Sequence, residues 1–147
     1  MATFAPDTFP RPVDSAILTA FDNVWDGLAV PGTWWTATER VAIVAATRTS
    51  LPLPLGEVTP DPGGLSDTVG PDGLSALTRE AVRRLAVDAG RITGDWAAAV
   101  VDRLGPGRYV EMVALVVQTV PVDLLCDLLG RPHQDLPTPK AGEPSQA

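Results

Sequence analysis

The stretch RYVEMVALVVQTVPVDLLCDLLGR, residues 108–131, is the longest apolar run in the chain. Its apolar residues cover more than half of a helical circumference, and Glu111 and Gln118, seven positions apart, leave only a thin polar line. A helix that is apolar on most sides is buried against several neighbours. Pro121 removes one backbone donor from it. The stretch therefore predicts a central helix near 108–129 that is kinked at Pro121 or begins a second segment there.

The same run is long enough to cross a membrane, but it contains carboxylates. Each carboxylate near the centre of a membrane helix costs about 2.5–3.5 kcal/mol on insertion scales. We expect Asp123 and Asp127 on the solvated side of the segment that follows Pro121. The sequence thus predicts a buried core helix and no membrane partner.

Four further helices are predicted, which gives an all-α fold of about five helices. Apolar residues at helical spacing indicate the first helix, and Thr36 with Glu39 forms a T-x-x-E capping box that begins the second. Gly90 is a typical residue just after the end of the third, and Thr93 is a typical N-cap of the fourth. The expected ranges are 14–28, 36–49, 75 or 77 to about 90, and 93–104.

Composition divides the chain around one domain. Residues 1–13 have three prolines and are expected to form an extended arm, whereas 14–131 form a single helical domain. Within the domain, 51–74 contains five prolines and five glycines in 24 residues, which predicts a long flexible loop. Residues 132–147 contain four prolines and are predicted to be a disordered tail.

Net charge and cysteine content restrict the partners and the compartment. The net charge is −7, so the chain lacks the cationic surface that attracts nucleic acid or anionic membranes. One cysteine forbids an internal disulfide, and MATFAPDTFPRP has no basic or apolar signal-peptide region. These features predict a cytoplasmic protein that binds neither nucleic acid nor membrane.

The candidate nucleophile is Cys126, the only thiol. It lies late in its helix beside Asp127, where both the helix dipole and the carboxylate oppose ionisation, so a buried structural cysteine is the favoured interpretation. His133 could reach Cys126 in principle, but Pro132 separates them and no third group orients the pair. One Cys and one His do not make a metal site, and the glycine-rich turns lack phosphate-loop context. We therefore assign no catalytic, cofactor-binding or metal-binding residue.

Two other groups have structural and functional interpretations. Glu111 and Gln118 could line a polar cleft in the core, although a solvent-facing line or a pairing of Glu111 with Arg40 or Arg108 is favoured. The tryptophans of the N-terminal half could, with Tyr109, wall a pocket for a small apolar ligand. Sealing of a small core or a subunit interface is the favoured role of these side chains, which are Trp25, Trp34 and Trp35.

Four segments in order resemble the alkylhydroperoxidase D-like (AhpD-like) superfamily, which includes carboxymuconolactone decarboxylases, and in particular an actinobacterial branch of it. They are GTWWTATERVAIVAATR (32–48), REAVRRLAVDAGRITGDW (79–96), RYVEMVALVVQTVPVDLLCDLLGRP (108–132) and GEPSQ (142–146). The resemblance covers about half of the chain. It implies an AhpD-like helical bundle and a homo-oligomer. It also implies that relatives continue past the GEPSQ segment, so this chain is expected to be a C-terminally short form.

The resemblance also implies thiol peroxidase chemistry in active members, which use E-x-x-x-C-x-x-C followed by a histidine. The corresponding place here reads ATRTSLPLPLGEV, residues 46–58, without either cysteine or the histidine. The sequence therefore predicts a catalytically degenerate family member without thiol peroxidase activity, and leaves open whether it is an enzyme. The alternatives are a CxxC-independent decarboxylase or isomerase acting on a small apolar or aromatic acid or lactone, and an oligomeric helical binding module.

Overall fold

The computed structural model describes residues 13–51 and 60–146, and in those ranges the fold is all-α. Five α-helices are present, with no β-strand among the described residues, as the sequence predicts. Two short 3₁₀ helices, η2 (Pro62–Gly64) and η3 (Ala89–Arg91), lie between them. The helices are α1 (Ser15–Leu28), α2 (Ala37–Ser50), α3 (Ala76–Val87), α4 (Gly94–Leu104) and α5 (Pro106–Leu128).

Side-chain caps fix the first residue of four helices. Asp14, Thr36, Ser75 and Thr93 each accept a hydrogen bond from a backbone N–H in the first turn of α1, α2, α3 and α4 respectively. The capping box is complete, because Glu39 also accepts from the backbone N–H of Thr36. The predicted helix starts are therefore confirmed, and each is set by a local interaction.

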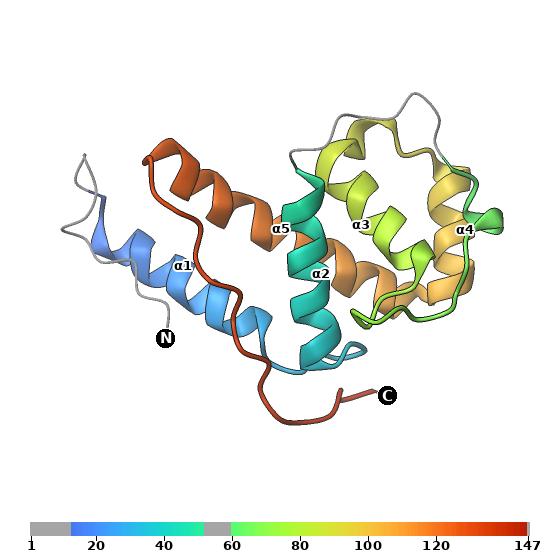
Figure 1. Cartoon of the computed structure of the whole chain (residues 1–147), viewed down its shortest axis with the longest axis horizontal. Coiled ribbons are helices and arrows are strands. Elements are labelled where there is room, and N and C mark those ends of the chain that lie inside the picture. Colours follow the sequence, from blue (N-terminus) through green and yellow to red (C-terminus); the bar gives the residue numbers. More distant parts are fainter. Residues whose placement is uncertain (1–12, 52–59, 147) are drawn as a thin grey trace.

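Helix α5 is the central element and packs against each of the other four helices (Figure 1). It starts at Pro106, whose missing N–H costs nothing in the first turn, and continues as one helix through Pro121. A second segment starting at Pro121 is thus not observed. Its inner face joins the core through Met112, Leu115, Val116 and Val122, and the neighbouring helices contribute mainly Ile43, Val44, Leu77, Val82 and Val100.

One prediction about α5 is wrong. We expected Asp123 on the solvated side, but its side chain is only 1% exposed. The cause is Arg48 on α2, which donates hydrogen bonds to both carboxylate oxygens and so offsets the cost of burying the charge. The spacing of apolar residues along α5 does not reveal this partner. Asp127, one turn later, is 64% exposed as predicted.

The segments rich in proline pack on the helices where they are described. The predicted arm lies outside the described residues except for Val13, and so do residues 52–59 of the predicted flexible loop. In the rest of that loop Pro62 and Leu74 are buried. The tail from 132 to 146 contains no helix and runs past α1 and α2 (Figure 1), where the backbone N–H of Lys140 donates to Ala29.

By length and composition alone, α5 could also cross a membrane. Many core helices of soluble proteins pass the same test, so this property is weak evidence in either direction. The structure adds that α5 contains the buried Asp123 and packs against every other helix.

Candidate functional site

Cys126 is buried near the C-terminal end of α5. Burial raises the pKa of its thiol, the negative charge of Asp123 raises it further, and a backbone hydrogen bond from Gln134 opposes these effects only in part. A thiol that stays protonated and covered is a poor nucleophile. The environment thus agrees with the favoured interpretation of Cys126 as a packing residue.

His133 lies beside two acidic groups. Its Nε2 lies 2.8 Å from Asp127 Oδ1, and its Nδ1 lies 4.0 Å from Asp123 Oδ2. The imidazole therefore hydrogen-bonds to Asp127 at the end of α5, and the Asp123 carboxylate lies beyond hydrogen-bond distance of its other ring nitrogen. Among the described residues, no hydrogen bond joins this imidazole to the Cys126 thiol.

Arg48 and Asp123 form a bidentate pair between α2 and α5. Arg48 Nε donates to one carboxylate oxygen at 2.7 Å and Nη2 donates to the other at 2.5 Å. Arg48 Nη1 also donates to the carbonyl of Gln134 at 2.6 Å, and the guanidinium stacks on Trp25 with 4.4 Å to the ring centroid. This one cation therefore connects α1, α2, α5 and the tail, and its role is structural.

Glu111 has a similar structural role at the other end of α5. Its Oε2 accepts from the backbone N–H of Thr33 at 3.1 Å and of Trp34 at 2.9 Å, and its Oε1 pairs with Arg40. The pairing with Arg40 was one of the expected interpretations and is confirmed. The carboxylate fixes the turn between α1 and α2. Gln118 is exposed, and neither side chain lines the pocket described below.

Of the three N-terminal tryptophans, Trp25 contacts the tail, while Trp34 and Trp35 both contact the first turn of α5. The indole N–H of Trp25 donates to the carbonyl of Asp135, and that of Trp35 donates to the carbonyl of Arg108. Trp34 packs against Gly107, where a Cβ atom would overlap the ring. Trp25 and Trp35 are buried in the core. Sealing of the core is therefore the observed role of Trp25 and Trp35, whereas Trp34 is half-buried.

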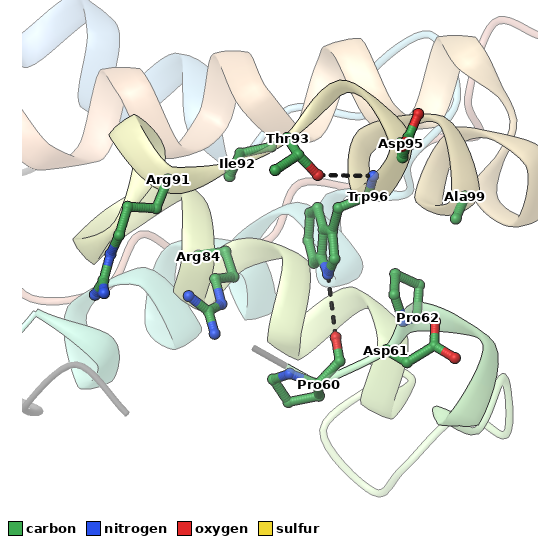
Figure 2. Close-up of a pocket in the computed structure, with 10 residues that line it drawn as sticks. All are labelled: Pro60, Asp61, Pro62, Arg84, Arg91, Ile92, Thr93, Asp95, Trp96 and Ala99. Carbon is green, nitrogen blue, oxygen red and sulfur yellow. Dashed lines mark hydrogen bonds between the residues drawn. The ribbon is translucent and has the colours of Figure 1, made fainter. Parts of the chain in front are cut away.

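A pocket forms instead around the fourth tryptophan, Trp96, between α3, α4 and residues 60–62 (Figure 2). Its volume is about 310 Å³, which lies at the small end of the range for ligand pockets. The lining is predominantly apolar near the indole and charged at its edges. The residues are Pro60, Asp61, Pro62, Arg84, Arg91, Ile92, Thr93, Asp95, Trp96 and Ala99.

Two hydrogen bonds hold Trp96 in the pocket wall. The indole Nε1 donates to the carbonyl of Pro60 at 3.2 Å, and the backbone N–H is capped by the Thr93 hydroxyl at 3.2 Å (Figure 2). The first bond attaches the 60–62 segment to α4. The ring is thereby positioned before any ligand arrives, which lowers the entropy lost on binding.

A cluster of five charged side chains lies beside the pocket. Arg84 donates to Glu80 at 3.1 Å and to Asp88 at 2.6 Å, and Arg91 donates to Asp88 at 2.7 Å. Arg83 adds two bonds to Glu80, which raise the pKa of its guanidinium. Three cations thus meet two carboxylates, which leaves one excess positive charge beside the pocket in an acidic protein.

The hydrogen bond from Arg91 lowers the pKa of Asp88 below its ordinary 3.8, although burial opposes the shift. A carboxyl whose folded pKa is depressed stabilises the fold above its unfolded pKa. That contribution is lost as pH falls below about 4, because the unfolded chain binds the proton first. We therefore expect Asp88→Asn to reduce the loss of stability between about pH 5 and pH 3, measured by urea unfolding. An unchanged pH slope in Asp88→Asn would contradict this role.

The pocket offers binding chemistry more readily than covalent chemistry. The indole of Trp96 provides a flat apolar face, while Arg91 at the rim provides N–H donors that suit a carboxylate. Asp61 and Asp95 on other sides limit the anionic character that a ligand can have. In the described part of the chain, no three His, Cys, Asp or Glu side chains gather in a metal-like cluster.

Sequence reasoning missed this pocket. Trp96 falls within the helix predicted over 93–104, and Pro60 and Pro62 lie in the predicted flexible loop, so nothing in the sequence pattern joins them. Their contact spans 36 residues of sequence. The indole N–H of Trp96 was the only available signal for this contact, because a buried tryptophan usually donates a hydrogen bond to some acceptor.

The comparisons with known proteins add no assignment. No protein-family model, curated protein or solved structure matches this chain.

Proposed function

We propose that this chain is a catalytically degenerate AhpD-like helical protein, cytoplasmic and homo-oligomeric, without thiol peroxidase activity. The family assignment rests on the four sequence segments that resemble the superfamily. The observation that carries the functional part is the state of Cys126, which is the only thiol in the chain and is buried with a raised pKa. A peroxidatic thiol must be ionised and accessible to a peroxide, and the burial of Cys126 opposes both.

Two measurements on the same samples test this proposal. We expect hydroperoxide consumption, with dithiothreitol as reductant, to equal that of buffer for both the wild type and Cys126→Ala. We also expect labelling of Cys126 by a thiol reagent to be about a hundredfold slower in the folded protein than in urea. Peroxide turnover that is present in the wild type and lost in Cys126→Ala would contradict the proposal.

A second function, binding of a small aromatic or apolar acid, is favoured by the Trp96 pocket. The pocket has the volume for one ring, a preorganised indole, and an arginine at its rim. This is the ligand class of the CxxC-independent alternative, and the proposal assigns it to the Trp96 pocket instead of to a cleft at Glu111. The side chains that line the pocket support recognition of a ligand, and we assign no reaction to them.

Benzoate is a suitable probe for this second function, and benzyl alcohol is its neutral counterpart. By isothermal titration we expect benzoate to bind more tightly than benzyl alcohol, and Trp96→Ala to weaken benzoate at least about tenfold. Trp34→Ala is the matched control, since Trp34 lies outside the pocket. Equal affinities in the wild type and Trp96→Ala, or no measurable binding by the wild type, would exclude the pocket as a site for this class.

A further inference from the structure

The exposed side of α5 carries an apolar stripe with a regular spacing. Its members follow one another at intervals of four, three, four, three and four residues along the helix. Four of them are 51–75% exposed, and the other two are also classed as exposed. The stripe consists of Val110, Ala114, Val117, Pro121, Leu124 and Leu128.

That spacing is the heptad pattern of helices that pack along their length. A helix whose apolar residues only fill the core of its own domain has no need to repeat the pattern on the opposite face. Here the inner face already contains Met112, Leu115 and Val116. The outer stripe is therefore a second packing surface, and its geometry suits another helix better than a flat or irregular partner.

The stripe is matched to itself in an antiparallel arrangement. If two copies of α5 cross near residue 119, Val110 faces Leu128 of the second copy, Ala114 faces Leu124, and Val117 faces Pro121. Each layer then pairs an a position of one heptad with a d position of the other, which is the pairing found in antiparallel helix pairs. In the Ala114–Leu124 layer a small side chain meets a large one, which allows close packing.

At the stripe itself, charge does not oppose a second copy as the occupant. The chain has a net charge of −7, so two copies repel each other over most of their surfaces. Between Val110 and Leu124 the exposed residues of α5 are all uncharged, and Gln118 beside the stripe is neutral. No lysine or arginine of α5 flanks the stripe to attract anionic lipid headgroups, in contrast to helices that lie on membranes.

We propose that α5 forms an antiparallel homodimer interface through this stripe. The inference rests on the oligomer of the proposed function and specifies its surface. From Val110 to Leu128 the stripe is about 27 Å long at 1.5 Å per residue and about 10 Å wide. That area is well below the roughly 800 Å² per partner of a standard interface, so the dimer dissociates on dilution.

Sedimentation velocity of the full chain from about 1 to 500 μM tests the interface. We expect a shift from monomer to dimer with concentration in the wild type, and monomer throughout for Val117→Glu and Leu124→Glu. The matched control is Val69→Glu, because Val69 and Val117 are both 63% exposed. Circular dichroism is used to check that each variant is folded. Two stripe variants are tested so that the result does not depend on one that fails to fold.

Orientation is tested with single cysteines in a Cys126→Ala background and a short bis-maleimide. Gln118→Cys lies near the crossing point and is expected to cross-link to itself. Val110→Cys is not, because its counterpart lies about 27 Å away along an antiparallel pair. Cross-linking of Val110→Cys to itself would overturn the antiparallel arrangement.

Two other outcomes also overturn the inference. If both Val117→Glu and Leu124→Glu still form the oligomer, the interface lies elsewhere and the proposed homo-oligomer stands. If the wild type is a monomer at every concentration, both the α5 interface and the proposed homo-oligomer are wrong. Binding of the wild type, but not Val117→Glu, to vesicles of phosphatidylcholine and phosphatidylglycerol would identify lipid as the occupant. The peroxide assay tests the rest of the proposed function independently.

Discussion

Replacing Asp123 with alanine is expected to lower the free energy of unfolding by about 3–5 kcal/mol, because it leaves the Arg48 cation without its carboxylate. Arg48 is mostly buried between α2, the tail and Trp25, so water cannot replace the two lost hydrogen bonds fully. A loss of this size is a large fraction of the 5–15 kcal/mol that is typical of a domain. Urea unfolding followed by circular dichroism measures it.

Asp127→Ala is the matched control for this experiment. Asp127 lies on the same helix one turn later and is also hydrogen-bonded, to His133, but its side chain is 64% exposed. Its loss is expected to cost less than about 1 kcal/mol. If Asp123→Ala were no more destabilising than Asp127→Ala, the Arg48–Asp123 pair would not have the structural role described.

Gly32→Ala is expected to destabilise the protein by about 2–3 kcal/mol, through overpacking and the loss of hydrogen bonds. A Cβ atom at Gly32 would overlap the Glu111 carboxylate and crowd the Arg40 guanidinium. Glu111 cannot move aside freely, because it accepts hydrogen bonds from the backbone of both Thr33 and Trp34. The added methyl group therefore breaks the connection between α5 and the turn that precedes α2.

Gly27→Ala provides a contrast of opposite sign. Gly27 lies in the last turn of α1, and a Cβ atom there would have no neighbour within 4 Å. Alanine in a helix is more stable than glycine by about 0.5–1 kcal/mol, so this variant is expected to be stabilised. Comparison of the two substitutions thus distinguishes the effect of steric crowding at Gly32 from the effect of backbone entropy at Gly27. Equal effects of the two substitutions on the urea midpoint would contradict the crowding at Gly32.

Helix positions could be predicted because their causes are local. The Thr36–Glu39 capping box and Thr93 act within one turn of the chain, and their spacing is visible in the sequence. The pairing of Glu111 with Arg40 was one of the alternatives that the sequence left open. The all-α class and the central position of α5 follow from the same local patterns.

The remaining features depend on contacts between distant segments. Burial of Asp123 requires Arg48, which is 75 residues away, and a pattern of apolar positions cannot reveal which carboxylate will find a cation. The Trp96 pocket requires residues 60–62 to meet α4, which turn and loop composition does not indicate. The stripe on α5 was visible as apolar content, but its exposure became known only when the other helices were placed.

The central position of α5 has a consequence for the order of folding. It is the last helix in the described chain, yet it supplies the surface against which α1, α2, α3 and α4 all pack. During synthesis the first four helices emerge before that surface exists, so their apolar faces stay incompletely covered until residues 106–128 have left the ribosome. Contacts of such long sequence separation also slow folding, because a large loop must close before they form. A ribosome-bound chain that ends before α5 should therefore bind chaperones, and one that includes it should not.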